Sequence, residues 1–199
     1  MTAVHGWQPS LLGFDPPRFT LEAGMARRRH LGNGAWVDVV PGALTGADAL
    51  FDEVLAAAPW AAHDRPMFDR IVREPRLTTR RWPDPPALVT AIAGRLSRHY
   101  GLDLGVISAN LYRDGDDSVA WHGDRVGRVR AETVVAILSL GSTRRFLLRP
   151  KGGGPSVRYA PAAGDLLVMG GTCQRTWEHT VPKCAPVGPR VSLMFREAY

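Results

Sequence analysis

The hydrophobic pattern changes period at about residue 106, and this change most constrains the fold. From there to residue 196, apolar and polar residues alternate in short runs that are separated by glycine- and proline-rich turns, a pattern typical of half-buried strands. The sequence predicts eight such strands: Val106–Tyr112, Ser118–His122, Val134–Leu140, Arg145–Arg149, Ser156–Tyr159, Asp165–Met169, Thr176–His179 and Val191–Arg196. Many short strands that follow two helices predict an α+β fold with a jelly-roll core, a double-stranded β-helix.

Two supporting helices are predicted before these strands. Thr45 is expected to cap the first helix, whose apolar positions form one stripe. The stripe consists of Ala47, Leu50, Phe51, Val54 and Leu55. The second helix is predicted from Pro86 to Tyr100, where Gly101 ends it. A short strand is also expected at Trp36–Val40.

Composition excludes several classes of protein. A length of 199 residues with 45% hydrophobic residues suits one globular domain. No run approaches the roughly 18 apolar residues of a membrane span, so we expect no membrane partner. The first residues lack a basic segment followed by an apolar one, which predicts no secretion signal. Cys173 and Cys184 are the only cysteines, which fits a cytoplasmic protein without disulfides.

The net charge of +6 comes almost entirely from arginine, since only Lys151 and Lys183 among the 25 basic residues are lysine. A basic surface is compatible with a polyanionic partner, because phosphates bind such surfaces with release of counterions. The same composition also arises in an arginine-biased proteome. Charge alone therefore leaves both explanations open.

A His-x-Asp pair, His122 and Asp124, ends one predicted strand, and His179 lies in a distant one. Residues two apart on a strand point to the same side, so His122 and Asp124 can share one metal ion. Two imidazoles and one carboxylate form the ligand set of non-haem Fe(II) oxygenases. A jelly-roll could also hold another metal with these residues, or none.

Two arginines six residues apart bound the run RVSLMFR: Arg190 directly precedes the last predicted strand and Arg196 ends it. A strand that presents guanidinium groups to the same cavity can hold a dicarboxylate through charge-assisted hydrogen bonds. Asp165 is expected to organise a turn. Gln174 and Trp177 are expected to support the strand that presents His179.

Several ordered motifs carry a resemblance to a known family. They are Asn110-Leu111-Tyr112, His122-Gly123-Asp124, SLGSTRRFLLRP, GDLLVMGGTCQRTWEH and RVSLMFR. Together they resemble the AlkB family of 2-oxoglutarate- and Fe(II)-dependent dioxygenases, which oxidatively demethylate damaged or modified nucleic acid. The resemblance extends from Asn110 to Arg196 and, more weakly, back to PRLTTRRW at Pro75–Trp82.

The resemblance implies an enzyme with Fe(II), the co-substrate 2-oxoglutarate and O2, which releases formaldehyde, succinate and CO2. It implies that Arg190 pairs with the distal carboxylate of 2-oxoglutarate and that Tyr112 helps to bind it. Asn110 and Arg196 match residues near the C1 end of the co-substrate. Ser192 stands where the family often has asparagine.

The substrate is predicted to be single-stranded or flipped-base DNA or RNA, because a base inside a duplex cannot reach a buried metal. Candidate contacts come mostly from a basic segment that ends in an aromatic residue: Phe68, Arg76, Arg80, Arg81 and Trp82. Trp82 is equally compatible with core packing. Arg125 is a further candidate, although repair members of the family commonly carry acidic residues just after His-x-Asp.

A single dioxygenase domain, 1–199, is expected. It is divided into an irregular N-terminal arm at 1–30, a basic substrate-lid loop at 66–86 and a jelly-roll catalytic core at 106–197. We expect a monomer. A dioxygenase acting on a protein or small molecule and a non-catalytic nucleic-acid-binding module remain alternatives.

Overall fold

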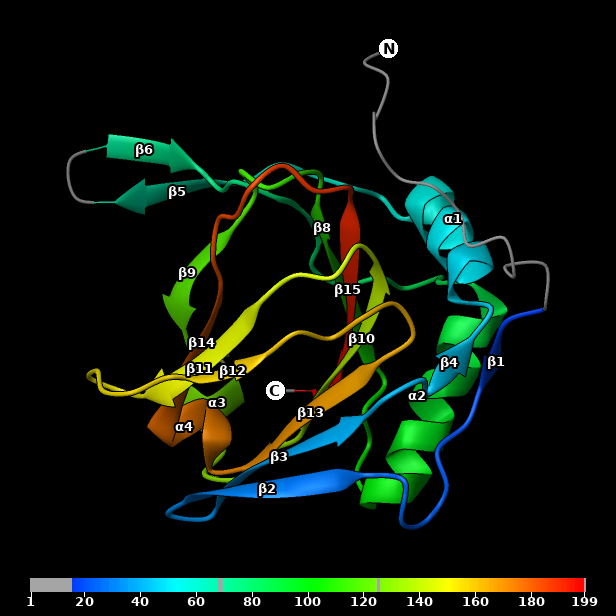
Figure 1. The fold of residues 1–199 in the computed structure, drawn as a ribbon, viewed down its shortest axis with the longest axis horizontal. Helices are drawn as coiled ribbons and strands as arrows, with labels where there is room; N and C mark the ends of the chain where they lie inside the picture. Colours follow the sequence, from blue (N-terminus) through cyan, green and yellow to red (C-terminus); the bar gives the residue numbers. More distant parts are fainter. Residues whose placement is uncertain (1–15, 68–69, 125, 199) are drawn as a thin grey trace.

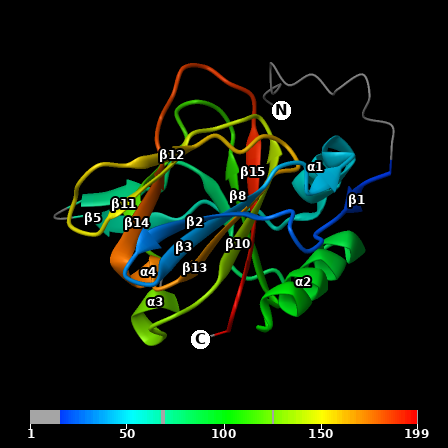
Figure 2. The ribbon, with the colours of Figure 1, turned by 60° about the horizontal axis from the view of Figure 1, so that its bottom comes forward.

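Two antiparallel sheets form the centre of the structure, a computed structural model that describes residues 16–67, 70–124 and 126–198. The major sheet contains, in order, β2 (Arg27–Gly32), β3 (Ala35–Val40), β13 (Leu166–Gly171), β10 (Val135–Gly141), β15 (Arg190–Arg196), β8 (Val106–Tyr112) and β7 (Leu77–Thr79). The minor sheet contains β12 (Val157–Tyr159), β11 (Phe146–Pro150), β14 (Trp177–Val181) and β9 (Val119–His122). Figures 1 and 2 show the two sheets from two directions.

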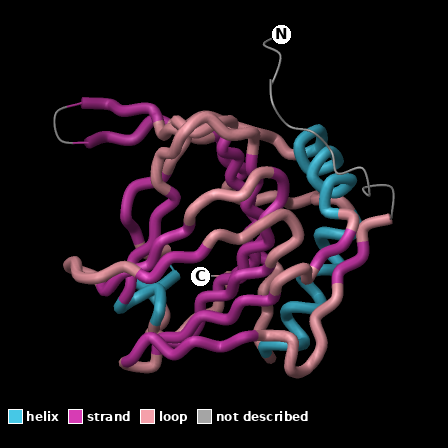
Figure 3. The backbone as a smooth tube through the Cα atoms, viewed as in Figure 1, coloured by secondary structure: helices cyan, strands magenta, loops and turns pink. Residues whose placement is uncertain are grey.

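The remaining elements flank the sheets. Two short strand pairs are β1 (Arg18–Phe19) with β4 (Leu44–Thr45), and β5 (Asp64–Met67) with β6 (Arg70–Arg73). The helices are α1 (Ala47–Ala57), α2 (Ala87–Tyr100) and the single turns α3 (Val126–Val129) and α4 (Cys173–Thr176). As Figure 3 shows, the two long helices lie together on one side of the molecule.

Strand β10 is buried on both of its faces, which explains its almost continuous apolar sequence. Ala136, Leu138 and Leu140 belong to the core that the major sheet shares with α1 and α2. Val135 and Ile137 belong to the second core, between the two sheets. Because successive side chains alternate across a strand, one strand serves both cores.

The two long helices cover the major sheet with one apolar face each. The stripe predicted for α1 is largely confirmed, since Ala47, Leu50, Phe51 and Val54 are buried. Gly101 ends α2 in the left-handed conformation at φ 68°, as predicted. Thr45 does not cap α1. It lies in β4 and donates to the carbonyl of Arg18, while Gly46 occupies the cap position without a side-chain bond.

All eight strands predicted between residues 106 and 196 are present, with ends that differ by no more than two residues. The predicted strand at Trp36–Val40 is also confirmed, as β3. Asp165 organises a turn as expected, because its carboxylate accepts the backbone N–H groups of Gly42 and Ala162 at 2.8 and 2.9 Å.

The N-terminal and central segments depart from the predicted boundaries. Residues 27–30 belong to the edge strand β2 and not to an irregular arm, because the backbone of β2 pairs with β3. Segment 66–86 is a ribbon for part of its length: β5 and β6 form a hairpin, and β7 joins the edge of the major sheet. In the described part of the chain, no helix is long and apolar enough to cross a membrane.

Candidate metal centre and co-substrate cavity

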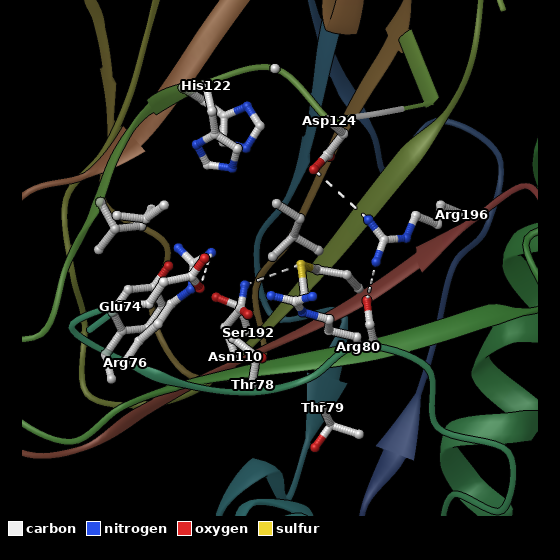
Figure 4. A pocket seen from close by; sticks show the side chains of 18 of the residues that line it. Glu74, Arg76, Thr78, Thr79, Arg80, Asn110, His122, Asp124, Ser192 and Arg196 are labelled. Atoms are coloured by element: carbon white, nitrogen blue, oxygen red, sulfur yellow. Dashed lines mark hydrogen bonds and ion pairs between the residues drawn. The ribbon is translucent and has the colours of Figure 1, made fainter. Parts of the chain in front are cut away.

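Strands β9 and β14 of the minor sheet bring His122 and His179 together. The two residues are direct partners across these strands, and their ring centroids are 4.3 Å apart. Asp124 follows His122 after one residue, and candidate ligand atoms of all three lie within 4.8 Å of one another. The structure thus gathers the three residues that the sequence singled out, as Figure 4 shows for His122 and Asp124.

Asp124 is held in place by the short helix α4. The buried Gln174 side chain accepts a hydrogen bond from the backbone N–H of Asp124 at 2.9 Å. Gly123 passes so close to α4 that a Cβ atom there would lie 2.7 Å from the carbonyl oxygen of Gln174. We expected Gln174 only to support the strand of His179. Its contact with the Asp124 backbone could not be found in the sequence, because the two residues are 50 apart.

The hydrogen bonding of His122 selects one of its ring nitrogens for a metal. Nδ1 lies 2.8 Å from the carbonyl oxygen of Ala120. A carbonyl oxygen only accepts, so Nδ1 carries the proton and Nε2 is left as the free lone pair. His179 is buried, and burial together with the neighbouring His122 lowers its pKa to about 3. It is therefore neutral at physiological pH, the form that binds metal.

Arg190 is a buried cation without a carboxylate partner in the described part of the chain. It donates to the hydroxyls of Ser192 and Ser139 at 2.6 and 3.0 Å, and its Nε has no partner. Burial lowers its pKa to about 10, so it remains charged at neutral pH. Burying a guanidinium is costly without an anion, and this arginine therefore fits an anionic ligand.

The other predicted co-substrate residues lie beside Arg190. Strand pairing sets Tyr112 opposite Arg190 and Asn110 opposite Ser192. The Asn110 amide donates to the Met194 sulfur at 3.4 Å. Ser192, where the family often has asparagine, makes the shortest contact to Arg190 through its hydroxyl.

Arg196 connects this group to the candidate metal ligands. One of its terminal nitrogens lies 3.9 Å from the Asp124 carboxylate, and the other donates to the Ser108 hydroxyl at 2.8 Å. Its Nε is buried without a partner. Arg196 can therefore still donate to an anion next to Asp124 (Figure 4).

A second buried arginine, Arg144, was not identified from the sequence. Its side chain donates to the backbone carbonyls of Asp114, Asp117 and Pro182 at 2.6 to 2.9 Å. It therefore fixes the connection between β8 and β9 to the loop after β14. No local sequence signal marks these contacts, because all three acceptors are backbone groups.

The candidate ligands line one cavity of about 600 Å³ together with four of the co-substrate residues, Asn110, Tyr112, Ser192 and Arg196, a size in the range of small-molecule sites. Arg190 does not itself line the cavity but lies behind Ser192, to which it donates. Three of the predicted substrate residues, Arg76, Arg80 and Arg81, also line it. Arg128 of α3 lines it too and was not predicted.

The remaining predicted substrate residues do not reach this cavity or cannot be placed. Trp82 is only 5% exposed and belongs to the core beneath the helices, so the core-packing alternative holds and Trp82 is not a substrate contact. Its large apolar ring gains more from that burial than from exposure at the rim. Phe68 and Arg125 lie outside the described residues, as do the side chains of Arg70 and Arg73.

The sequence profile of the 2OG-Fe(II) oxygenase superfamily matches residues 47–196, about three quarters of the chain. The chain belongs to this superfamily. Its cofactors are those of the superfamily, Fe(II), 2-oxoglutarate and O2. The superfamily profile includes every candidate ligand and co-substrate residue described above.

Curated relatives confirm the resemblance to the AlkB family. Alpha-ketoglutarate-dependent dioxygenase alkB homolog 3 is 30% identical in Bos taurus, over 78% of this chain and 63% of the relative. The Homo sapiens protein is 31% identical, over 77% and 62%. DNA oxidative demethylase ALKBH2 of Homo sapiens is 33% identical over 49% and 41%. The chain thus spans less than two thirds of the length of these relatives.

Solved structures confirm the jelly-roll fold. The structure of OsALKBH1 superposes with a TM-score of 0.61 at 13% identity, covering 86% of this chain and all of that one. A 2OG-Fe(II) family oxidoreductase from Burkholderia pseudomallei gives a TM-score of 0.54 at 14% identity, with 80% and 84% covered. At these identities the likeness concerns the fold alone.

Proposed function

We propose that this chain is a 2-oxoglutarate- and Fe(II)-dependent dioxygenase that demethylates N-alkylated bases in single-stranded or flipped-base DNA or RNA. One observation carries the proposal: a single cavity is lined by His122, Asp124 and His179 as well as by a row of arginines from the segment before α2. The first group suits a metal, and the second suits a phosphate backbone. The names of the AlkB relatives support the same activity.

The donor set fits Fe(II). Two neutral imidazoles and one carboxylate would hold the ion on one face through His122 Nε2, His179 and Asp124. When bound, the iron supplies the activation of O2 that oxidises the methyl group at the expense of 2-oxoglutarate. Gln174 would orient Asp124, and the Ala120 carbonyl would orient the ring of His122.

The buried arginines fit the co-substrate. The guanidinium of Arg190 would bind the distal carboxylate of 2-oxoglutarate. This anion is a stronger acceptor than the two neutral serine hydroxyls to which Arg190 donates now. Arg196 and Asn110 would contact the other end of the molecule, since both line the cavity near the candidate ligands. Tyr112 would close the site beside Arg190.

The segment at 66–86 would act as a lid over the nucleic acid. Arg80 and Arg81 are exposed where they line the cavity, so they can approach phosphates without being desolvated. Positioning the methyl carbon and excluding water are the tasks of the protein in such a reaction.

The proposal is tested by formaldehyde and succinate release from single-stranded oligonucleotides that carry one methylated adenine or cytosine, as DNA and as RNA. Wild-type protein with Fe(II), 2-oxoglutarate and O2 is expected to release both products in equal amounts. His122→Ala should release neither, while keeping its fold by circular dichroism. If wild-type protein forms succinate but neither binds nor demethylates any oligonucleotide, the nucleic-acid assignment fails and a protein or small-molecule substrate takes its place.

A further inference from the structure

The segment before α2 forms one wall of the cavity, around strand β7. Glu74, Arg76, Thr78, Arg80 and Arg81 all line the cavity. Thr78 lies in β7, whereas the backbone bends at residues 75 and 76, where the Arg76 N–H donates to the Glu74 carbonyl at 2.8 Å. Thr79 also contacts the cavity, but its hydroxyl is turned to the carbonyl of Pro59. Strand β7 and its flanks therefore present one acid, three arginines and a hydroxyl to a ligand in the cavity.

Two buried polar groups of this wall have no hydrogen-bond partner in the described part of the chain. Thr78 is 5% exposed, and its hydroxyl makes no hydrogen bond, although it lies directly across from Asn110 in the sheet. The Nε of Arg76 is also buried without a partner. Buried polar groups are nearly always paired in native proteins, so this wall fits a polar ligand.

Glu74 is the one mostly buried acid of the wall. Its side chain is 20% exposed, whereas Asp64, the other acid near it in the cavity, is exposed. The nearest Arg76 nitrogen is 3.7 Å from its carboxylate, too far for a strong hydrogen bond. The Glu74 carboxylate thus keeps acceptor capacity, and Figure 4 shows it with Arg76 on the side of the cavity away from Arg196.

Glu74 lies in a cavity whose other charged side chains are mostly arginines. Arg76, Arg80, Arg81, Arg128 and Arg196 all line the cavity, and Asp124 is committed to the candidate metal centre. Without Glu74, the exposed Asp64 would be the one remaining acid among the described lining residues outside the metal centre. A positively charged ligand would be repelled there, because like charges at close range are unfavourable in a partly buried site.

Methylated bases fall into two chemical classes at their Watson–Crick edge. Adenine methylated at N1 and cytosine methylated at N3 carry a positive charge and an exocyclic amino group, which only donates. Guanine methylated at N1 and thymine methylated at N3 are neutral, and they carry a carbonyl oxygen, which only accepts, at C6 or C4, where adenine and cytosine carry the amino group. A carboxylate accepts and does not donate, so it favours the first class and disfavours the second.

We infer that Glu74 is the residue by which this chain selects positively charged, amino-bearing methylated bases, an inference that rests on the proposed function. Glu74 accepts a hydrogen bond from the exocyclic amino group and offsets the charge of the base against the surrounding arginines. Glu74, which precedes β7, would supply the acid of the substrate site, because the residue directly after Asp124 is an arginine in this chain.

The test compares wild-type protein with Glu74→Gln on four single-stranded oligonucleotides, carrying N1-methyladenine, N3-methylcytosine, N1-methylguanine or N3-methylthymine. The quantity measured is the ratio of kcat/KM for the charged bases to that for the neutral ones. A lost hydrogen bond to a charged group predicts a fall in this ratio of about 10- to 100-fold. A general loss of folding lowers both values together and leaves the ratio unchanged.

Two further measurements make the result decisive. Glu53→Gln, an exposed acid on α1, serves as the matched control and should keep the wild-type ratio. Affinities of the metal-free protein for the same oligonucleotides should show the same loss of preference in Glu74→Gln without any turnover. If the ratio is unchanged in both assays, the inference is wrong and the demethylase proposal stands. If wild-type protein demethylates none of the four, the proposed function fails and this inference with it.

Discussion

Arg144 and Arg190 each hold their guanidinium carbon 5.6 Å from the ring centroid of Tyr112. The two arginines are equally buried, but their partners differ in kind. Arg144 donates to three backbone carbonyls, whereas Arg190 donates to two serine hydroxyls that form weaker contacts with a cation. Both arginines leave their Nε without a partner, so the difference lies in the acceptors. The carbonyls bound by Arg144 belong to the fold, whereas an anion would be a stronger partner for Arg190 than the two hydroxyls.

Replacing Arg190 with methionine should separate co-substrate binding from folding. The variant removes a buried cation that has no carboxylate partner, so the ligand-free protein should be as stable as wild type or more stable. Its affinity for 2-oxoglutarate should fall by about 3–5 kcal/mol, because a carboxylate would be buried without its guanidinium. Thermal melts with and without 2-oxoglutarate test both effects. Retention of the ligand-induced stabilisation would show that another group anchors the distal carboxylate.

Replacing Arg144 with methionine should instead destabilise the fold. Three backbone carbonyls lose their donor, at a cost of about 3 kcal/mol or more in the free energy of unfolding. The neighbouring Arg145 is exposed and makes only one long contact, at 3.5 Å, so Arg145→Met should change stability by less than about 0.5 kcal/mol. Urea unfolding of the two variants gives the comparison. Equal stabilities would mean that the Arg144 contacts contribute nothing net.

The contrast between these arginines also indicates what the sequence can predict. Period-two spacing was enough to place Arg190 on the same face as Arg196, because side-chain direction follows from strand geometry. The same spacing correctly predicted that His122 and Asp124 lie together, although β9 ends at His122. Arg144 and Gln174 bind backbone groups of distant segments, for which side-chain pattern carries no signal. Trp82 could be assigned either to the rim or to the core from its neighbours, and only tertiary packing decides between them.

The depressed pKa of His179 predicts how the metal-free protein responds to acid. The folded state holds this histidine neutral down to about pH 3, whereas the unfolded chain protonates it near 6.5. The contribution of neutral His179 to the free energy of unfolding is therefore complete above pH 6.5. It is lost as the pH falls towards 3, by at most about 1.4 kcal/mol for each pH unit. Urea unfolding between pH 7.5 and 5 in the presence of a chelator should show this slope in wild type. A His179→Gln variant with the same slope would assign the acid sensitivity to other groups.

Arg80 and Arg81 should control the salt dependence of oligonucleotide binding. If both contact phosphates of a single strand, changing both to serine should reduce the slope of log affinity against log salt by about 1.4. Arg27 and Arg29 provide a control of equal charge, because they are exposed on the edge strand β2 and do not line the cavity. Changing that pair to serine should leave the slope close to wild type, since phosphate contacts act locally within about a Debye length. Fluorescence anisotropy with a labelled single strand at several salt concentrations measures both slopes. An equal reduction in the two double variants would mean that binding responds to net charge alone, and the lid segment would lose its assigned contact with the strand.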